Sequence, residues 1–113
     1  MSQPFPVKTQ HNEVLQAPTA FPHTTEPLEM YRAGTIIIAD LTTDTLALTG
    51  LLGDVPGSAA ETDAIPVQDM DGVTQQGTGL SNGTYYFDCM FDYLKITKTG
   101  VADTPNITIF VRG

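Results

Sequence analysis

The chain has 113 residues, enough for one domain, and its 41% of apolar residues excludes a wholly disordered protein. Thirteen acidic residues against five basic ones give a net charge of −8, and the basic residues form no run, which argues against binding to nucleic acid or to an anionic membrane surface. No apolar stretch approaches the ~20 residues of a membrane-spanning helix, and the single cysteine excludes an internal disulfide.

Residues 1–30 hold five of the eight prolines. Because proline removes a backbone donor and breaks helices, this pattern predicts an extended, proline-rich N-terminal arm, followed by a domain over residues 31–113. The start of the chain lacks the features of a secretory signal, which indicates synthesis in a cytoplasm. The apolar residues of the arm follow neither a helical nor a strand period, and we expect them to be anchors that contact a partner: Phe5, Val7, Val14, Leu15, Phe21, Leu28 and Met30.

Short β-rich runs begin at Gly34. Residues 35–39 form a β-branched run, and residues 45–51 alternate with Leu46 and Leu48 on one face, so both are predicted strands. The polar residues 40–44 between them are predicted to be a hairpin connection. A longer loop is expected to open at residue 53 and to run to about residue 64.

The middle of the chain contains two tight-turn signals. Met70-Asp71-Gly72 separates predicted strands at 65–69 and 73–76, which indicates a hairpin. Asn82-Gly83 repeats the signal before residues 84–91, the most aromatic stretch of the chain. We therefore expect residues 84–91 to form a central strand.

The C-terminal third alternates regularly between apolar and polar residues. Residues 93–99 and 106–112 are predicted strands, and residues 100–105 are expected to join them as a hairpin. About seven short strands without a helical period predict an all-β fold. We expect a small antiparallel β-sandwich or jelly-roll-like barrel.

The candidate reactive groups do not form a catalytic pattern. Cys89 lies within a predicted strand, whereas His11 and His23 lie in the arm, so a small buried thiol is favoured over a nucleophile. Residues 69–72 resemble the opening of a calcium loop, but the position of the essential glutamate falls on Leu80, which favours a solvated hairpin turn. We expect no catalytic residue, no cofactor and no metal, and hence no enzyme.

Two Asn-X-Thr triplets begin at Asn82 and Asn106 and match the N-glycosylation signal. Without a signal peptide, glycosylation is the less favoured interpretation. A hairpin Asn-Gly and an asparagine at a strand edge explain the two triplets without glycans.

Residues 65–113 contain a Gly-rich loop, the aromatic run Tyr85-Tyr86-Phe87, the strand YLKITKTG and the final strand ITIFVRG. In general layout this region, together with the N-terminal arm, resembles small β-sandwich proteins of tailed-bacteriophage virions. The resemblance implies a capsid decoration, or cement, protein. Such a protein would be made in the host cytoplasm, reside on the capsid surface of the virion and clasp the major capsid protein with its arm, without contacting nucleic acid or membrane.

Unpaired sheet edges and few charges further predict a homo-oligomer, specifically a homotrimer. The alternative function is a carbohydrate- or receptor-binding β-sandwich module of a fibre or cell surface. An exposed Tyr85, Tyr86 or Tyr93 in a concave site would favour that alternative.

Overall fold

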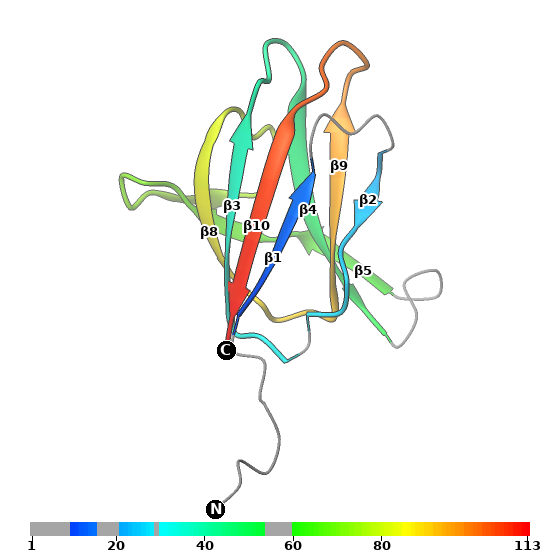
Figure 1. The fold of residues 1–113 in the computed structure, drawn as a ribbon, viewed down its shortest axis with the longest axis vertical. Coiled ribbons are helices and arrows are strands. Elements are labelled where there is room, and N and C mark those ends of the chain that lie inside the picture. Colours follow the sequence, from blue (N-terminus) through cyan, green and yellow to red (C-terminus); the bar gives the residue numbers. More distant parts are fainter. Residues whose placement is uncertain (1–9, 16–20, 29, 54–59) are drawn as a thin grey trace, which may run out of the picture.

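The structure is a computed structural model that describes the backbone of residues 10–15 and all atoms of residues 21–28, 30–53 and 60–113. The described residues form ten strands and no helix (Figure 1). No helix long and apolar enough to cross a membrane is therefore found in this part of the chain. The strands are β1 (Gln10–Leu15), β2 (His23–Thr24), β3 (Ala33–Ala39), β4 (Thr45–Leu52), β5 (Ala60–Ala64), β6 (Pro66–Gln68), β7 (Thr74–Gln76), β8 (Gly83–Asp88), β9 (Tyr93–Thr99) and β10 (Asn106–Arg112).

The strands make two antiparallel sheets. One has six strands in the order β1-β10-β3-β8-β6-β7, and the other has four in the order β2-β9-β4-β5. The predicted all-β sandwich is confirmed. It contains more strands than the seven expected, because short or polar strands lie at the sheet edges.

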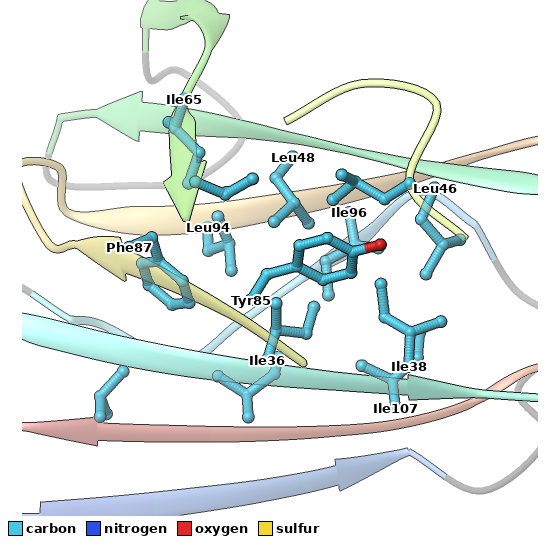
Figure 2. Close-up of a cluster of buried hydrophobic side chains, with 14 of the residues drawn as sticks. Ile36, Ile38, Leu46, Leu48, Ile65, Tyr85, Phe87, Leu94, Ile96 and Ile107 are labelled. Carbon is cyan, nitrogen blue, oxygen red and sulfur yellow. The ribbon is translucent and has the colours of Figure 1, made fainter. Parts of the chain in front are cut away.

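The core lies between the two sheets, where alternate side chains of β3, β8 and β10 meet those of β4 and β9 (Figure 2). Leu46 and Leu48 of β4 face Ile36 and Ile38 of β3 across the interior, and Tyr85 lies among them. The alternation predicted for the C-terminal strands is also confirmed. Its inward residues are all buried: Leu94, Ile96, Ile107, Ile109 and Val111.

The connections at 40–44 and 100–105 are not hairpins, contrary to the prediction. Strands β3 and β10 belong to the six-stranded sheet and pair with each other, whereas β4 and β9 pair within the other sheet. Each connection therefore carries the chain from one sheet to the other. The alternation of apolar residues within a strand shows which side chains are buried, but it does not show which other strand lies beside it. The prediction that each short loop joins two paired strands is therefore wrong.

The two crossover loops are bound to each other through Asp103, which is buried. Its Oδ2 accepts hydrogen bonds from the backbone N–H groups of Thr42, Thr43 and Asp44 at 2.8, 2.8 and 2.7 Å. The hydroxyl of Thr42 donates to Oδ1 at 2.6 Å. In return, the Asp103 N–H donates to Asp44 Oδ2 at 2.8 Å, so the two loops form one polar cluster.

The hairpin predicted around Asp71-Gly72 is confirmed as β6 and β7, and it extends beyond β8 in Figure 1. Asp69 Oδ1 accepts the N–H groups of Asp71 and Val73 at 2.9 and 3.0 Å, and Gly72 supplies a positive φ of 82°. The predicted central strand is also confirmed, because β8 lies between β3 and β6. It ends at Asp88 rather than at residue 91.

The long loop expected up to residue 64 ends earlier, because β5 pairs with β4 at the edge of the four-stranded sheet. The sequence of β5 is Ala-Glu-Thr-Asp-Ala, and none of its side chains is fully buried. An edge strand of this kind has no buried face and hence no apolar alternation to identify it.

Within the first thirty residues, the described segments 10–15 and 21–28 pair with or pack on the sandwich, so the boundary expected at residue 30 does not separate them from it. Strand β1 pairs with β10 over its whole length, and β2 pairs with β9. Thr25 continues this attachment, since its N–H donates to the carbonyl of Leu94 at 2.9 Å. The described segments are extended, as predicted, and their backbones pair with strands of the same chain.

Candidate functional site

The outer face of the six-stranded sheet contains an open hollow of about 770 Å³. Its lining residues come from β3, β8 and β10 and from the β6–β7 hairpin. Inward positions of these strands fill the core, so the intervening positions project to this face. We call this surface the outer hollow.

Strand register places two aromatic residues in one row across the outer hollow. Phe110 and Tyr86 both pair with Thr35, from opposite sides, and Gln68 pairs with Tyr86. Tyr86 is 42% exposed and Phe110 is 39% exposed. The row therefore presents two aromatic side chains with a small threonine between them.

The neighbouring rows complete the outer hollow. In one, Ile37 lies between Thr108 and Thr84 and is 38% exposed. In the other, at the end of the strands, Ala33 lies between Arg112 and Asp88. The apolar surface is thus bordered by hydroxyl groups and by one residue of each charge.

Close packing beneath the outer hollow holds β3 and β8 in place. Gly34 pairs with Phe87, and a Cβ added at Gly34 would lie 2.3 Å from the Phe87 ring. Only glycine leaves room for the ring at this position. Phe87 in turn stacks on Phe91, with ring centroids 6.1 Å apart, so the strands that carry Thr35 and Tyr86 rest on a packed aromatic layer.

The described lining of the outer hollow contains few groups capable of acid–base or nucleophilic chemistry. Among the described residues that line it, Asp88 is the one carboxylate, and there is no histidine or cysteine. A general acid–base pair or a nucleophile with its base needs at least two such groups within reach of each other. No group of three potential metal ligands occurs in the described part of the chain.

Cys89 follows β8 and is partly buried against the core. Burial, and then the negative charge of Asp88, raise the pKa of its thiol to about 11. The thiol is therefore protonated at neutral pH, whereas a reactive cysteine needs a thiolate.

The residues predicted as arm anchors fall in several places. Leu28 is buried in the protein's own core, Phe21 is partly buried against that core, and Met30 is 61% exposed. Val14 and Leu15 lie in β1, where their backbones pair with Thr108 and Ile107. Phe5 and Val7 lie outside the described residues. Binding of these residues to a partner remains a prediction.

The three tyrosines named for a binding module are separated by the structure. Tyr85 and Tyr93 are buried, and the Tyr85 hydroxyl donates to the Ser81 carbonyl at 3.1 Å. Tyr86 alone of the three is exposed, and it lies in the outer hollow. Sequence reasoning missed Ile37 and Phe110, although both are apolar residues at the outward positions of alternating strands.

The two Asn-X-Thr asparagines make contacts between loops and strands. The Asn82 side chain accepts the Leu41 N–H at 2.8 Å and donates to the Leu41 carbonyl at 2.9 Å. The Asn106 amide donates to the Asp40 carboxylate. Both contacts give these asparagines a structural role in the unmodified chain.

Comparison with known proteins relates the fold to one solved structure. No family model matches the sequence, and no curated protein matches it. The fold is similar to that in the crystal structure of the SPBc2 prophage-derived protein YomS, with a TM-score of 0.67. The superposed region covers 96% of this chain and 99% of the YomS chain. The two sequences are 13% identical, so the likeness shows a shared fold.

Proposed function

We propose that the protein is a structural protein of a tailed-bacteriophage virion, and specifically a capsid decoration protein that binds and stabilises the outer surface of the major capsid shell. The observation that carries the proposal is the fold likeness to a prophage-derived protein over almost the full length of both chains. The absence of paired reactive groups from the described lining of the outer hollow is compatible with a structural role.

The charge of the protein fits the outside of a particle. A net charge of −8 disfavours contact with packaged nucleic acid, whose phosphates would repel it. A decoration protein on the outer surface avoids that repulsion, whereas a protein lining the genome would face it.

One end of the sandwich carries exposed apolar side chains suited to contact with another protein. Met30 precedes β3, Met90 follows β8, and Leu52 ends β4, which places all three at the same end. They are exposed, Met90 to 82%. Methionine is enriched at protein interfaces because its flexible side chain adapts to the partner, so we assign this end to the shell.

Stabilisation of the shell would follow from binding alone. A ligand that binds only the assembled particle stabilises it by mass action. Copies that bridge adjacent subunits gain further from a high effective concentration. A homotrimer would bring three copies of the end that carries Met30, Leu52 and Met90 into contact with neighbouring capsid subunits.

The test uses virions of the phage whose genome encodes the protein. We expect the protein in purified particles, and we expect particles that lack it to lose infectivity faster on heating or osmotic shock. Adding back the purified protein should restore resistance, whereas a Met30→Lys, Met90→Lys double variant should not. Absence from purified virions would contradict a virion role. Equal resistance of the two particles would contradict decoration only.

A further inference from the structure

The outer hollow has a feature that attachment to a shell does not use: two exposed aromatic side chains in register. Neighbouring strands lie about 4.8 Å apart, so the backbones of β10 and β8, on either side of β3, are about 10 Å apart. Phe110 and Tyr86 project from these two strands at the level of Thr35. The aromatic rings of Phe110 and Tyr86 can thus act as two platforms, and the small side chain of Thr35 leaves the space between them open.

Pyranose sugars match this arrangement. One face of a pyranose ring carries mainly C–H groups, which pack on the face of an aromatic side chain, while its hydroxyl groups point outward from the edge. In an extended β-linked chain, every second ring presents the same face to a flat surface. Two platforms about 10 Å apart can therefore stack on two sugars of one chain, with the intervening sugar over Thr35.

Polar side chains border the two platforms on the side of the β6–β7 hairpin. Gln68 and Thr74 line the outer hollow there, and Thr84 lies next to Ile37. The amide of Gln68 is held in place, since its Nε2 donates to the Gly72 carbonyl at 3.1 Å. An apolar floor with a few fixed amide and hydroxyl groups is the usual composition of a small-ligand site.

The charge of the outer hollow disfavours an anionic ligand and suits a neutral one that carries hydroxyl groups. Its described lining contains one acid, Asp88, and one base, Arg112, whose formal charges cancel. The rest of the protein is strongly acidic, with a net charge of −8. An anionic ligand would be repelled by the protein as a whole, whereas the hydroxyl groups of a neutral ligand can donate to the Asp88 carboxylate and accept from the Arg112 guanidinium.

We propose that the outer hollow binds a neutral, extended, β-linked oligosaccharide, with Tyr86 and Phe110 as stacking platforms. The volume of about 770 Å³ suits a ligand of a few sugar units and lies within the roughly 300–1,000 Å³ of typical ligand sites. The two platforms are distinct from Met30 and Met90, to which we assign shell attachment, although Arg112 and Asp88 extend the outer hollow to that end of the sandwich.

The test is a titration of the full-length, ¹⁵N-labelled protein, followed by NMR, with three neutral hexasaccharides. Two are extended, the β-1,4-linked oligomers of glucose and of N-acetylglucosamine, and the third is the helical α-1,4-linked oligomer of glucose. We expect at least one β-linked oligomer to shift the amide signals of β3, β8 and β10. The α-linked oligomer should bind at least about tenfold more weakly, because it cannot lie on both platforms.

Variants separate stacking from general effects on the fold. Tyr86→Ala and Phe110→Ala should each weaken binding about tenfold or more, because each removes a buried aromatic contact in the complex. Tyr86→Phe keeps the ring and should retain most of the affinity. Val101→Ala, which alters an exposed residue in the 100–105 loop, should leave binding unchanged.

Three results would overturn the proposal. One is no shift with any β-linked hexasaccharide at millimolar concentration. Another is binding that survives both alanine variants while their spectra remain folded. The third is broadening of the β3, β8 and β10 signals with protein concentration alone, which would assign this face to a second copy of the chain. Because the measurements use the isolated protein, none of these results bears on virion attachment.

Discussion

At the scale of single residues, Asp103 connects the loops that cross between the sheets. The hydroxyl of Thr42, followed by the backbone N–H groups of Asp44, Thr42 and Thr43, holds the pKa of the Asp103 carboxyl well below its usual range. The folded-state pKa is below the unfolded value of about 3.9. The stability contributed by this carboxylate is therefore fully present above about pH 4 and is lost as the pH falls further.

Replacement of this carboxylate tests the pH dependence. Asp103→Asn should lower the free energy of unfolding at pH 7, and the difference from wild type should shrink in acid, because the carboxylate of the unfolded wild-type chain takes up a proton at a higher pH than that of the folded chain. Urea unfolding at pH 7 and pH 3 measures both effects. Asp71→Asn is the control, since Asp71 is an exposed residue in the turn of the β6–β7 hairpin. A difference between Asp103→Asn and wild type that does not change with pH would contradict this account.

Gly34 is the second residue whose role can be measured. An alanine Cβ would lie 2.3 Å from the Phe87 ring, so Gly34→Ala should cost about 1–3 kcal/mol through overpacking. In a Phe87→Leu background the same substitution should cost clearly less, because the ring is absent. Chemical denaturation of the four proteins gives this double-mutant cycle. Equal costs in both backgrounds would show that the ring does not restrict this position.

At the scale of elements, the Asp69 side chain stabilises the turn of the β6–β7 hairpin, beside a hydrogen bond from Gln68 to Gly72. Asp69→Ala removes the acceptor for the N–H groups of Asp71 and Val73 and should destabilise the hairpin by about 1 kcal/mol. Asp69→Asn keeps an oxygen acceptor and should cost less. Amide hydrogen exchange of residues 66–76 measures the local effect. If the amide protons of residues 66–76 were protected equally in Asp69→Ala and in wild type, the Asp69 side chain would not stabilise the hairpin.

The same elements show what could be predicted from sequence. Alternation in 45–51, 93–99 and 106–112 identified the strands and their buried faces, since a half-buried strand repeats every two residues. Partner strands were not predictable in the same way, because β3 and β10 are separated by some seventy residues and nothing local distinguishes a hairpin from a crossover. The edge strand β5 and the short strand β2 carry too few buried residues to produce a pattern.

The candidate site was predictable in part, for a related reason. Tyr86 could be named because exposed tyrosine is a recognised binding residue, but its partner Phe110 could not. The two lie in one row only because β10 and β8 both pair with β3. A site formed by residues of several strands depends on the order of those strands in the sheet. The alternation of apolar and polar residues does not predict that order.

At the scale of the whole molecule, the predicted homotrimer is tested on the isolated protein. Two sheet edges are available in each sheet, and those of the larger sheet are β1 and β7. Pairing between exposed edges drives association, so light scattering coupled to size exclusion should give three times the mass of one 12.1 kDa chain. A monomeric mass at high concentration would contradict the homotrimer in solution.

The N-terminal thirty residues serve the whole fold, and this changes how their role in attachment must be tested. Deletion of residues 1–30 removes β1, β2 and the core residue Leu28, leaving β10 and β9 without partners on one side. We expect this variant to unfold at a much lower temperature than the full chain, since it loses a core leucine worth about 2–5 kcal/mol together with two strand pairings. Deletion of residues 1–9 leaves all ten strands intact and should unfold near the wild-type temperature.

Shell binding should then be compared between the full chain and the shorter deletion, because loss of binding by the longer one would only report unfolding. Thermal unfolding followed by circular dichroism establishes which variant is folded. If the chain without residues 1–30 unfolded at the wild-type temperature, β1, β2 and Leu28 would not be integral to the sandwich. If the folded variant without residues 1–9 bound the shell with unchanged affinity, Phe5 and Val7 would not be anchors, and attachment would fall to the exposed end formed by Met30, Leu52 and Met90.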